Sequence, residues 1–345
     1  MERHYFAGGN TRDGFVDLYK YVIDRKACNK FFIIKGGSGV GKSTMLKKVA
    51  AAVCSYVKTV EFFHCSADID SLDGVAFREL GVALVDGTAP HVVEPVYVKA
   101  GDKAVDLAVY LNAEKLCDKK AELISIMDEK AAHYKHAYEL IKSMGSIYQS
   151  IYECIGNDID ARALSNVSDE LKDRVSSKGR GKRRALFAGA YTSLGEVYLE
   201  EKADKLKVVH LSGNVYVAAH VLSELYKKLS DGLHDLTLFY SPISTDYLYG
   251  LEVDNKILFT INDKIKSKDC VEFDSGARLK LSGNARTYAD TLGAHLDAVE
   301  NSACDCLKSA KLCHDKIEAI YKPAVDFNKV DKETDEIISE IKTLI

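Results

Sequence analysis

A glycine-rich segment near the N-terminus carries the residues best suited to chemistry. Residues 36–43 read GGSGVGKS and fit the pattern G-x-x-x-x-G-K-[ST]. Glycines let successive backbone N–H groups turn towards phosphate oxygens, because no Cβ blocks the approach. The Lys42 ammonium group would then contact the β- and γ-phosphates, and the Ser43 hydroxyl would bind Mg²⁺. The residues expected to bind a nucleoside triphosphate are Gly36, Gly37, Ser38, Gly39, Val40, Gly41, Lys42, Ser43 and Thr44.

The flanking residues predict the strand and the helix that such a loop requires. Residues 31–35 read FFIIK, an apolar run typical of a strand buried on both faces of a parallel sheet. Residues 44–53 read TMLKKVAAAV and predict a helix, whose N-terminus adds partial positive charge beside the phosphates. We therefore expect an α/β fold built on a P-loop NTPase-like parallel sheet.

The chain also contains an internal repeat. Residues 3–16 and 184–197 both read R-x-x-F-A-G-x-x-T-x-x-G-x-V, and at nearly constant offset the strand at 31–35 aligns with 208–212. Because the repeated residues persist in both copies, they are better explained as determinants of folding than of catalysis. A duplicated unit is therefore expected. Its parts are residues 1–176, a basic linker at 177–183, and residues 184–345.

The second copy has lost the chemistry of the loop. Gly36 aligns with Gly213, but the ammonium, the hydroxyl and two further glycines have no counterpart. The second copy is therefore expected not to bind a triphosphate in the usual way. In the alignment Tyr216 replaces Gly39, Ala218 replaces Gly41, Ala219 replaces Lys42 and His220 replaces Ser43.

An acidic residue closes the next apolar run of the first copy. Residues 82–86 read VALVD and align with LFTIN at 258–262, so Asp86 becomes Asn262 in the copy whose loop has diverged. The second copy thus lacks the counterparts of Lys42, Ser43 and Asp86 together, which favours a shared function for these three residues. We expect Asp86 to bind Mg²⁺ together with Ser43, in the case of Asp86 through water. The alternative is a turn residue, since Asp-Gly is common in turns.

Residues after the strand that begins at Val60 are candidates to act on a second substrate. Ligands of parallel sheets lie beyond the carboxyl ends of the strands, so this loop would face the nucleotide. Its polar residues would orient a water molecule or an acceptor hydroxyl, or would cap helices and form turns. Asp70 is taken as catalytic together with Lys42 and Asp86. The other candidates are His64, Asp68, Asp73 and, further along, His91, for which an ordinary loop position is the alternative.

Long amphipathic stretches complete each copy. Residues 112–152 lack Pro and are rich in Ala, Lys, Glu, Leu and Ile, and residues 284–321 are similar. We expect a helical hairpin at about 112–155 and a helical segment at the end of the second copy. Their default role is packing, and the alternative is a lever that binds a protein partner. The linker at 177–183 is expected to be exposed, with an arginine contacting the nucleotide or an acidic partner as alternatives.

Composition narrows the class of protein. The 345 residues carry a net charge of −4, which argues against a broad grip on nucleic acid. Nine cysteines, an odd number, do not form the dense framework of a secreted disulfide scaffold. No apolar stretch of 18 residues and no signal-like segment is present, so no membrane contact and a cytoplasmic location are expected. The Cys304, Cys306, Cys313 and His314 group is not expected to bind metal, because positions i and i+2 do not share a helix face.

Taken together, these motifs resemble a bacterial family of tandem P-loop proteins that are regarded as ATPases. The resemblance covers nearly the whole chain and implies ATP binding and two P-loop units, with no established substrate. The chain departs from the family in its second loop, so two working nucleotide sites are not expected. The matching motifs are FAGGNT at 6–11, the loop at 36–44, HCS at 64–66, SLD at 71–73 and DGTAPH at 86–91.

The sequence therefore predicts a protein that binds ATP and Mg²⁺ at one site and hydrolyses ATP slowly or on stimulation by a partner. Slow turnover is expected because no Glu follows Asp86, where many ATPases keep the base that polarises water. Two alternatives remain open. One is a small-molecule or nucleotide kinase, in which residues 64–73 hold the acceptor. The other is a non-enzymatic switch that binds ATP and engages a protein or nucleic acid.

Overall fold

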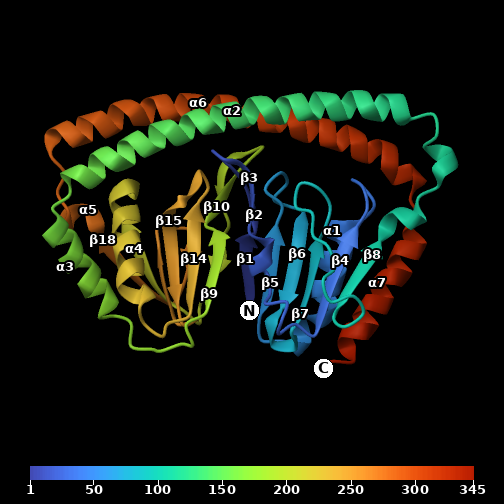
Figure 1. Ribbon diagram of the computed structural model, residues 1–345, viewed down its shortest axis with the longest axis horizontal. Helices are drawn as coiled ribbons and strands as arrows, with labels where there is room; N and C mark the ends of the chain where they lie inside the picture. The colour runs from blue at the N-terminus through green and yellow to red at the C-terminus, as the bar shows by residue number, and fades with distance from the viewer.

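The computed structural model describes residues 1–345, apart from the side chains of Glu201 and Lys202. It has an α/β fold with one large mixed sheet, whose twelve described strands run through the whole molecule (Figure 1). None of the described helices has both the length and the apolar character needed to cross a bilayer.

The six sheet strands of the N-terminal half lie in the order β8, β4, β7, β6, β5 and β1 from the edge to the centre. The six strands of the C-terminal half follow the same order as β18, β13, β16, β15, β14 and β9. The first set comprises β1 (Glu2–Phe6), β4 (Lys30–Lys35), β5 (Val60–His64), β6 (Leu72–Phe77), β7 (Val82–Asp86) and β8 (Asp102–Asp106). The second comprises β9 (Arg183–Phe187), β13 (Lys207–Ser212), β14 (Leu236–Ser241), β15 (Ser244–Val253), β16 (Ile257–Thr260) and β18 (Asp269–Asp274).

Strand directions also match between the halves. Strand β4 is parallel to both its neighbours, as is β13, whereas β6 and β15 are antiparallel to both of theirs. The halves join where β1 and β9 pair antiparallel through Phe6 and Phe187. The expected parallel sheet is thus mixed. The reason is that short connections lead from β5 to β6 and from β14 to β15, and a short connection can only return the chain antiparallel.

Both faces of β4 are buried, as its apolar run predicts. Phe32 and Ile34 pack with helix α1 (Lys42–Val53) on one face. Phe31 and Ile33 point to the opposite face, where their core also contains Leu186 and other residues of the C-terminal half. The alternation follows from the two-residue period of a strand. The two halves therefore share one continuous hydrophobic core.

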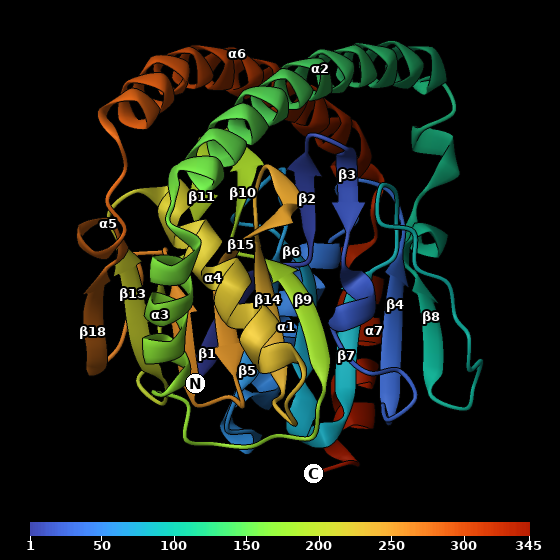
Figure 2. The ribbon, with the colours of Figure 1, turned by 60° about the vertical axis from the view of Figure 1, so that its left-hand side comes forward.

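Two 39-residue helices lie antiparallel above the sheet: α2 (Lys120–Asp158) and α6 (Gly283–Tyr321) (Figure 1). Each carries the chain to the opposite half. Helix α3 (Ala161–Lys172) follows α2 and packs on α4 (Val215–Ser230), whereas α7 (Phe327–Lys342) follows α6 and packs on α1 (Figure 2). A short helix, α5 (Ser275–Arg278), precedes α6.

The helical hairpin expected at about 112–155 is not found within the first copy. Residues 107–115 form two short 3-10 turns, and one uninterrupted helix then runs to Asp158. No Pro interrupts this stretch, so nothing in the backbone forces a turn. The apolar face of α2 is instead covered by α6 of the other half, including Ala303 and Leu307.

The repeated motif forms the same turn in both halves. Strands β2 (Gly8–Thr11) and β3 (Gly14–Asp17) form one hairpin, and β10 (Gly189–Thr192) and β11 (Gly195–Tyr198) form the other. Thr11 Oγ1 donates to the Gly14 carbonyl and accepts from the Asp13 amide, and Thr192 makes the equivalent bonds to Gly195 and Leu194. Gly14 and Gly195 have φ values of 92° and 91°, which favour glycine. The repeated Thr and Gly therefore determine the fold of this turn in both halves.

Buried ion pairs connect the halves across the central strands. Arg184 on β9 reaches across to β5, where its two Nη atoms lie 2.9 Å from the Glu61 carboxylate oxygens. Arg3 on β1 donates to Glu252 of β15 at 2.8 Å. In one pair the arginine comes from the C-terminal half, and in the other it comes from the N-terminal half. Removing one partner would leave a buried charge uncompensated, so these pairs fix how the halves join.

Helix α7 follows the C-terminal half in the chain but packs on α1 of the N-terminal half. We therefore expect α7 to contribute strongly to stability. Ile337 is fully buried against the core beneath α1, so Ile337→Ala is expected to lower the free energy of unfolding by about 2–5 kcal/mol. Urea unfolding followed by circular dichroism measures this change. The matched control is Ile124→Ala on α2, whose side chain is 49% exposed and should change stability little. Equal effects of the two substitutions would contradict this packing of α7.

Candidate functional site

The glycine-rich segment forms a loop between β4 and α1, as the sequence predicts. The strand ends at Lys35, and the helix begins at Lys42. Gly36, Gly39 and Gly41 have φ values of 132°, 77° and 98°, which side chains rarely adopt. Any other residue at these three positions would strain the loop.

Lys42 lies over the mouth of the loop. Its Nζ donates to the carbonyl oxygens of Gly36 and Gly37 at 2.9 and 2.8 Å and lies 3.5 Å from Asp86 Oδ2. The ammonium group is thus held where an anion entering the loop would meet it. Ser43 Oγ accepts a hydrogen bond from the Leu72 amide at 2.9 Å. That contact leaves the hydroxyl proton and a second lone pair available.

Asp86 forms the turn that its sequence position allows and also faces Lys42. It ends β7, directly beside Ile34 of β4. Its Oδ1 accepts from the amide and hydroxyl of Thr88 at 2.9 and 2.6 Å, which forms the expected turn. Its Oδ2 faces Lys42. The side chain is buried, so the carboxylate stands at the edge of the loop in a protected position.

Asp73 and His91 lie next to Asp86. Asp73, at the start of β6, is buried, and its pKa is raised to about 7 by burial and then by the neighbouring Asp86 carboxylate. His91 Nε2 lies 3.9 Å from Asp73 Oδ1. Burial lowers the pKa of His91, and its ring stacks on Tyr19 with centroids 4.7 Å apart. The structure thus brings a buried acid, a carboxylate and an imidazole to one corner of the loop.

The other candidates of residues 64–73 make their contacts outside the glycine-rich loop. Asp70 is exposed in a turn on the rim of the cavity described below, and its carbonyl oxygen accepts from Lys47. Asp68 accepts from Ser71 and lies 3.7 Å from Lys311 of α6. His64 is held by the Ile69 carbonyl and by His4, so it organises the loop from within. Asp73 is the member of this group whose pKa is influenced by the charges of both Asp86 and Lys42.

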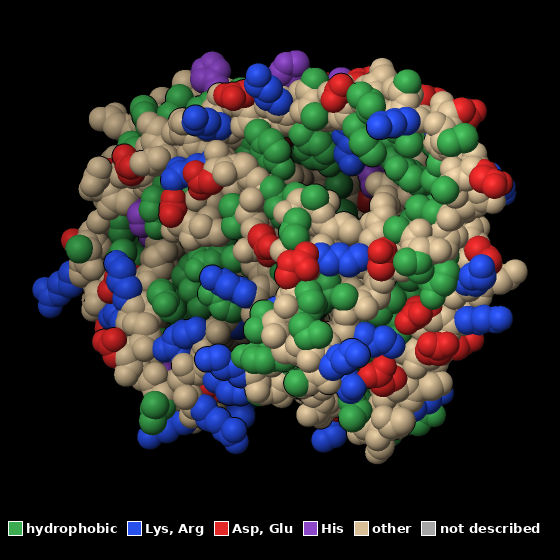
Figure 3. Space-filling model, turned by 45° about the vertical axis from the view of Figure 1, so that its right-hand side comes forward, with side chains coloured by type: hydrophobic (Ala, Val, Ile, Leu, Met, Phe, Trp, Pro, Cys, Tyr) green, Lys and Arg blue, Asp and Glu red, His purple; other side chains and the backbone are tan. Residues whose placement is uncertain are grey.

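A cavity of about 1190 Å³ opens above the loop and is roofed by both long helices. The face in Figure 3 is hollowed beneath the band of side chains at its top. Helix α2 contributes Lys130 and Tyr134, and α6 contributes Lys311 and His314. A nucleotide-sized ligand fits this volume.

The C-terminal half contributes directly to the loop. A Cβ at Gly39 would lie 3.2 Å from the Glu318 backbone on α6, and one at Gly41 would lie 3.5 Å from Phe327 of α7. A hydrogen bond to His314 lowers the pKa of Glu318 to about 2, so its carboxylate remains charged beside the loop. Sequence reasoning missed these residues because the repeat aligns the second half with the first and gives no sign that its last helices cross over.

A further sequence signal was missed at the start of α7. Residues 328–331 read NKVD, which matches the N-K-x-D pattern that reads guanine in GTP-binding proteins. Here the four residues are helical rather than part of a loop after a strand, and Asp331 Oδ1 lies 2.5 Å from Lys48 Nζ. The pattern therefore lies near the glycine-rich loop but lacks the loop conformation in which it reads guanine. Whether the protein prefers adenine or guanine is tested by experiment below.

The second half has no loop at the corresponding place. Helix α4 begins at Val215, and Asn214 caps it by accepting from the amides of Tyr216 and Val217. The positions aligned with 38–41 are therefore helical. Tyr216 packs against Tyr148 of α2, so an aromatic cluster fills this region. The residues that align with the loop of the first half thus form the cap and the first turn of a helix.

The basic linker lies away from the loop. Arg183 donates to the carbonyl oxygens of Ser230 and His234, at the end of α4. The Arg180 amide donates to Asp235, at the start of β14. These residues lie beside the first residues of β9 and β14. The glycine-rich loop, in contrast, follows the last residue of β4. Neither arginine is placed to contact the loop.

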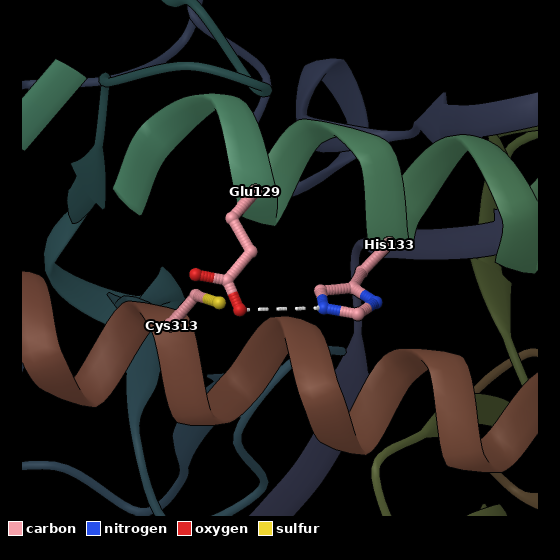
Figure 4. Close-up of side chains that lie close together, drawn as sticks. All are labelled: Glu129, His133 and Cys313. Carbon is pink, nitrogen blue, oxygen red and sulfur yellow. Dashed lines mark ion pairs between the residues drawn. The ribbon is translucent and has the colours of Figure 1, made fainter. Parts of the chain in front are cut away.

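A second group of metal-binding side chains lies between the long helices. Glu129 and His133 of α2 point towards Cys313 of α6 (Figure 4), and the three donor atoms lie within 4.8 Å of one another. Glu129 Oε1 lies 3.8 Å from His133 Nε2, so these two residues partly satisfy each other. No metal site is expected from the sequence among Cys304, Cys306, Cys313 and His314, and the structure instead brings Cys313 close to Glu129 and His133 of α2.

Comparisons of the chain with protein-family models, with curated proteins and with solved structures gave no match. The interpretation of the site accordingly depends on its residues and geometry. These are a glycine-rich loop with an ammonium group at its mouth, two buried acids beside it, and a cavity of suitable size.

The raised pKa of Asp73 predicts a pH-dependent stability. The folded pKa of about 7 lies above the ordinary value of 3.8, so between these values the folded chain binds a proton that the unfolded chain has released. Stability therefore falls as pH rises, by on the order of 1.4 kcal/mol per pH unit. In buffer containing EDTA, the stability of the native chain relative to Asp73→Asn should decline from pH 5 to pH 7 and level off above.

Urea unfolding at each pH measures this difference. The control is Asp13→Asn, whose side chain is 64% exposed and should give a difference that does not vary with pH. A pH-independent difference for Asp73→Asn as well would show that its carboxyl titrates normally.

Proposed function

We propose that the chain binds a nucleoside triphosphate with Mg²⁺, with ATP as the expected nucleotide, in the loop of residues 36–44. The observation that carries the proposal is the position of Lys42, whose ammonium group is held at the loop mouth by two carbonyl oxygens and faces Asp86. A triphosphate would replace the carbonyl contacts with stronger charge-assisted bonds. Ser43 and Asp86 would hold Mg²⁺, with Asp86 acting through water.

We further propose that the chain consists of two P-loop units, one working and one degenerate, and belongs with the tandem P-loop family whose motifs it carries. Supporting this are the identical order and directions of the strands in the two halves and the shared T-x-x-G turns. In the degenerate unit, neutral groups stand where the working unit is charged: Ala219 for Lys42 and Asn262 for Asp86. Its role is to supply α6 and α7 to the working site.

Slow hydrolysis of ATP is the proposed reaction. Lys42 would stabilise charge on the transferring phosphoryl group, and acids beside the cavity would orient water. Asp70 lines the cavity, but Asp73, whose pKa is influenced by the charges of Asp86 and Lys42, is the better-placed acid. The roof of α2 and α6 would exclude bulk water, and its movement would allow a protein partner to control turnover. The net charge of −4 does not favour nucleic acid as that partner.

The proposal predicts that Lys42→Ala strongly weakens binding of ATP. Loss of a charge-assisted bond costs about 1.5–3 kcal/mol, so affinity should fall by about 10- to 100-fold or more, and thermal stabilisation by Mg-ATP should disappear. Calorimetric titration and melting curves measure both effects. The control is Lys48→Ala on the same helix, whose ammonium group pairs with exposed Asp331 and should be dispensable. Unchanged nucleotide stabilisation of Lys42→Ala would refute the proposal.

The fate of the γ-phosphate distinguishes hydrolysis from phosphoryl transfer. Incubation with γ-labelled ATP and a pool of metabolites is expected to release free phosphate slowly, whereas a phosphorylated product would identify a kinase. The specific observation that keeps the kinase open is the size of the cavity, which leaves room for an acceptor near residues 65–73. Tight binding without turnover would instead identify a switch.

Competition between ATP and GTP tests the base. We expect ATP to bind more tightly, because the N-K-x-D match is helical and its Asp331 is engaged by Lys48. The measurement is displacement of a fluorescent ATP analogue by each nucleotide. A preference for GTP that disappears in Asp331→Asn would assign the reading of guanine to α7.

A further inference from the structure

Two carboxylates and an imidazole converge at the corner of the glycine-rich loop. Asp73 comes from β6, Asp86 from the end of β7, and His91 from the segment that follows. All three are buried, and one donor atom from each lies within 4.8 Å of the others. They belong to a fixed part of the fold, because β6 and β7 are neighbouring strands in which Gly74 pairs with Val85.

The His91 ring has no hydrogen-bond partner for either nitrogen among the described residues. The residue is only 5% exposed, and its closest carboxylate oxygen, on Asp73, is 3.9 Å away, too far for a hydrogen bond. Its ring plane lies within 5° of that of Tyr19, which fixes the orientation of the imidazole by stacking. A buried polar group without a partner is costly, and such groups in folded proteins mark a bound water or ion.

The two carboxylates also require a positive charge. Among the described ion pairs, Asp86 contacts Lys42 at 3.5 Å, and Asp73 contacts only His91. Two acids and one ammonium group leave this buried corner short of one positive charge when both acids are ionised. A divalent ion among the three side chains would supply that charge and give the imidazole a partner.

We propose that Asp73, Asp86 and His91 bind a divalent transition-metal ion, such as Mn²⁺, Fe²⁺ or Co²⁺. Two carboxylate oxygens and one neutral imidazole nitrogen form a three-ligand set with open positions, which such ions accept. The imidazole separates this site from the magnesium site of a nucleotide, because Mg²⁺ prefers oxygen ligands throughout. The inference extends the proposed function, because Asp86 belongs to both sites, but metal binding is measurable without nucleotide.

The open positions of this ion would face the cavity beside Lys42, since all three residues line that cavity. An ion there would bind water and promote its deprotonation, or would hold an oxygen of a bound phosphate. No Glu after Asp86 is then needed to polarise water. The site thus supplies a means of activation that the loop alone lacks.

The full chain, freed of metal with EDTA and without nucleotide, is titrated with Co²⁺ by calorimetry and by visible absorption. The native chain should bind one Co²⁺ without thiolate charge-transfer absorption. His91→Ala should weaken binding by more than about 100-fold, because even groups that merely support a ligand contribute about 10- to 100-fold. Mg²⁺ at the same concentration should not displace Co²⁺.

His133→Ala is the matched control, because His133 belongs to the other candidate group, with Glu129 and Cys313. It should leave the Co²⁺ affinity unchanged. Equal affinities of the native chain and His91→Ala would overturn the proposal. So would loss of binding in His133→Ala together with thiolate absorption, which would place the ion at Cys313.

Two further variants separate this inference from misfolding and from the proposed nucleotide site. Asp73→Asn keeps the size of the side chain and should lose Co²⁺ while its circular dichroism spectrum remains native; retention of Co²⁺ would overturn the site. Lys42→Ala should bind Co²⁺ at least as tightly as the native chain, since it removes a nearby positive charge, while losing ATP. If the native chain bound Co²⁺ but not ATP, the nucleotide proposal would be refuted and the metal proposal would stand.

Discussion

The reach of the two long helices is the constraint on which the rest of the arrangement depends. Thirty-nine residues at 1.5 Å per residue span about 59 Å, enough to carry the chain from one half of the sheet to the other. Helix α2 delivers α3 to the C-terminal half, and α6 delivers α7 to the N-terminal half. As a result, the loop that follows β4 is built by one half but enclosed by both. The C-terminal half thereby helps to enclose this loop, although the residues that align with the loop in its own sequence are helical.

Charge is distributed unequally between two halves of the same topology. In the first half, Lys42, Asp73, Asp86 and His91 lie within a small buried region. In the second, Asn262 takes the place of Asp86. A cluster of tyrosines, among them Tyr216 and Tyr249, lies near Glu196, whose carboxylate accepts a hydrogen bond from Tyr198. Neutral side chains can pack together without an ion or ligand, whereas buried charges require partners.

Local features were predictable from the sequence because local residues determine them. The apolar run at 31–35, the glycines at 36, 39 and 41, and the helix expected at 284–321 agree closely with β4, the loop and α6. The T-x-x-G repeat likewise identified two equivalent turns. The exchange of α3 and α7 was not predictable, because amphipathic spacing shows that a helix face is buried but not which element covers it. For the same reason, the sequence did not predict that Glu318 and Phe327 lie beside the glycine-rich loop. The arrangement of Asp73, Asp86 and His91 depends on the antiparallel pairing of β6 and β7, which short apolar runs do not specify.

The exchanged helices have a further consequence for assembly. Helix α7 reaches α1 through a tether made of its own chain, so the contact forms at the effective concentration that this tether sets. A second copy of the chain offers an identical acceptor surface on its α1. Reciprocal exchange between two copies would preserve every contact of α7 while linking the copies into a domain-swapped dimer. The α7–α1 interface would be the same in both forms, so chain concentration would set the balance between a closed monomer and a swapped dimer.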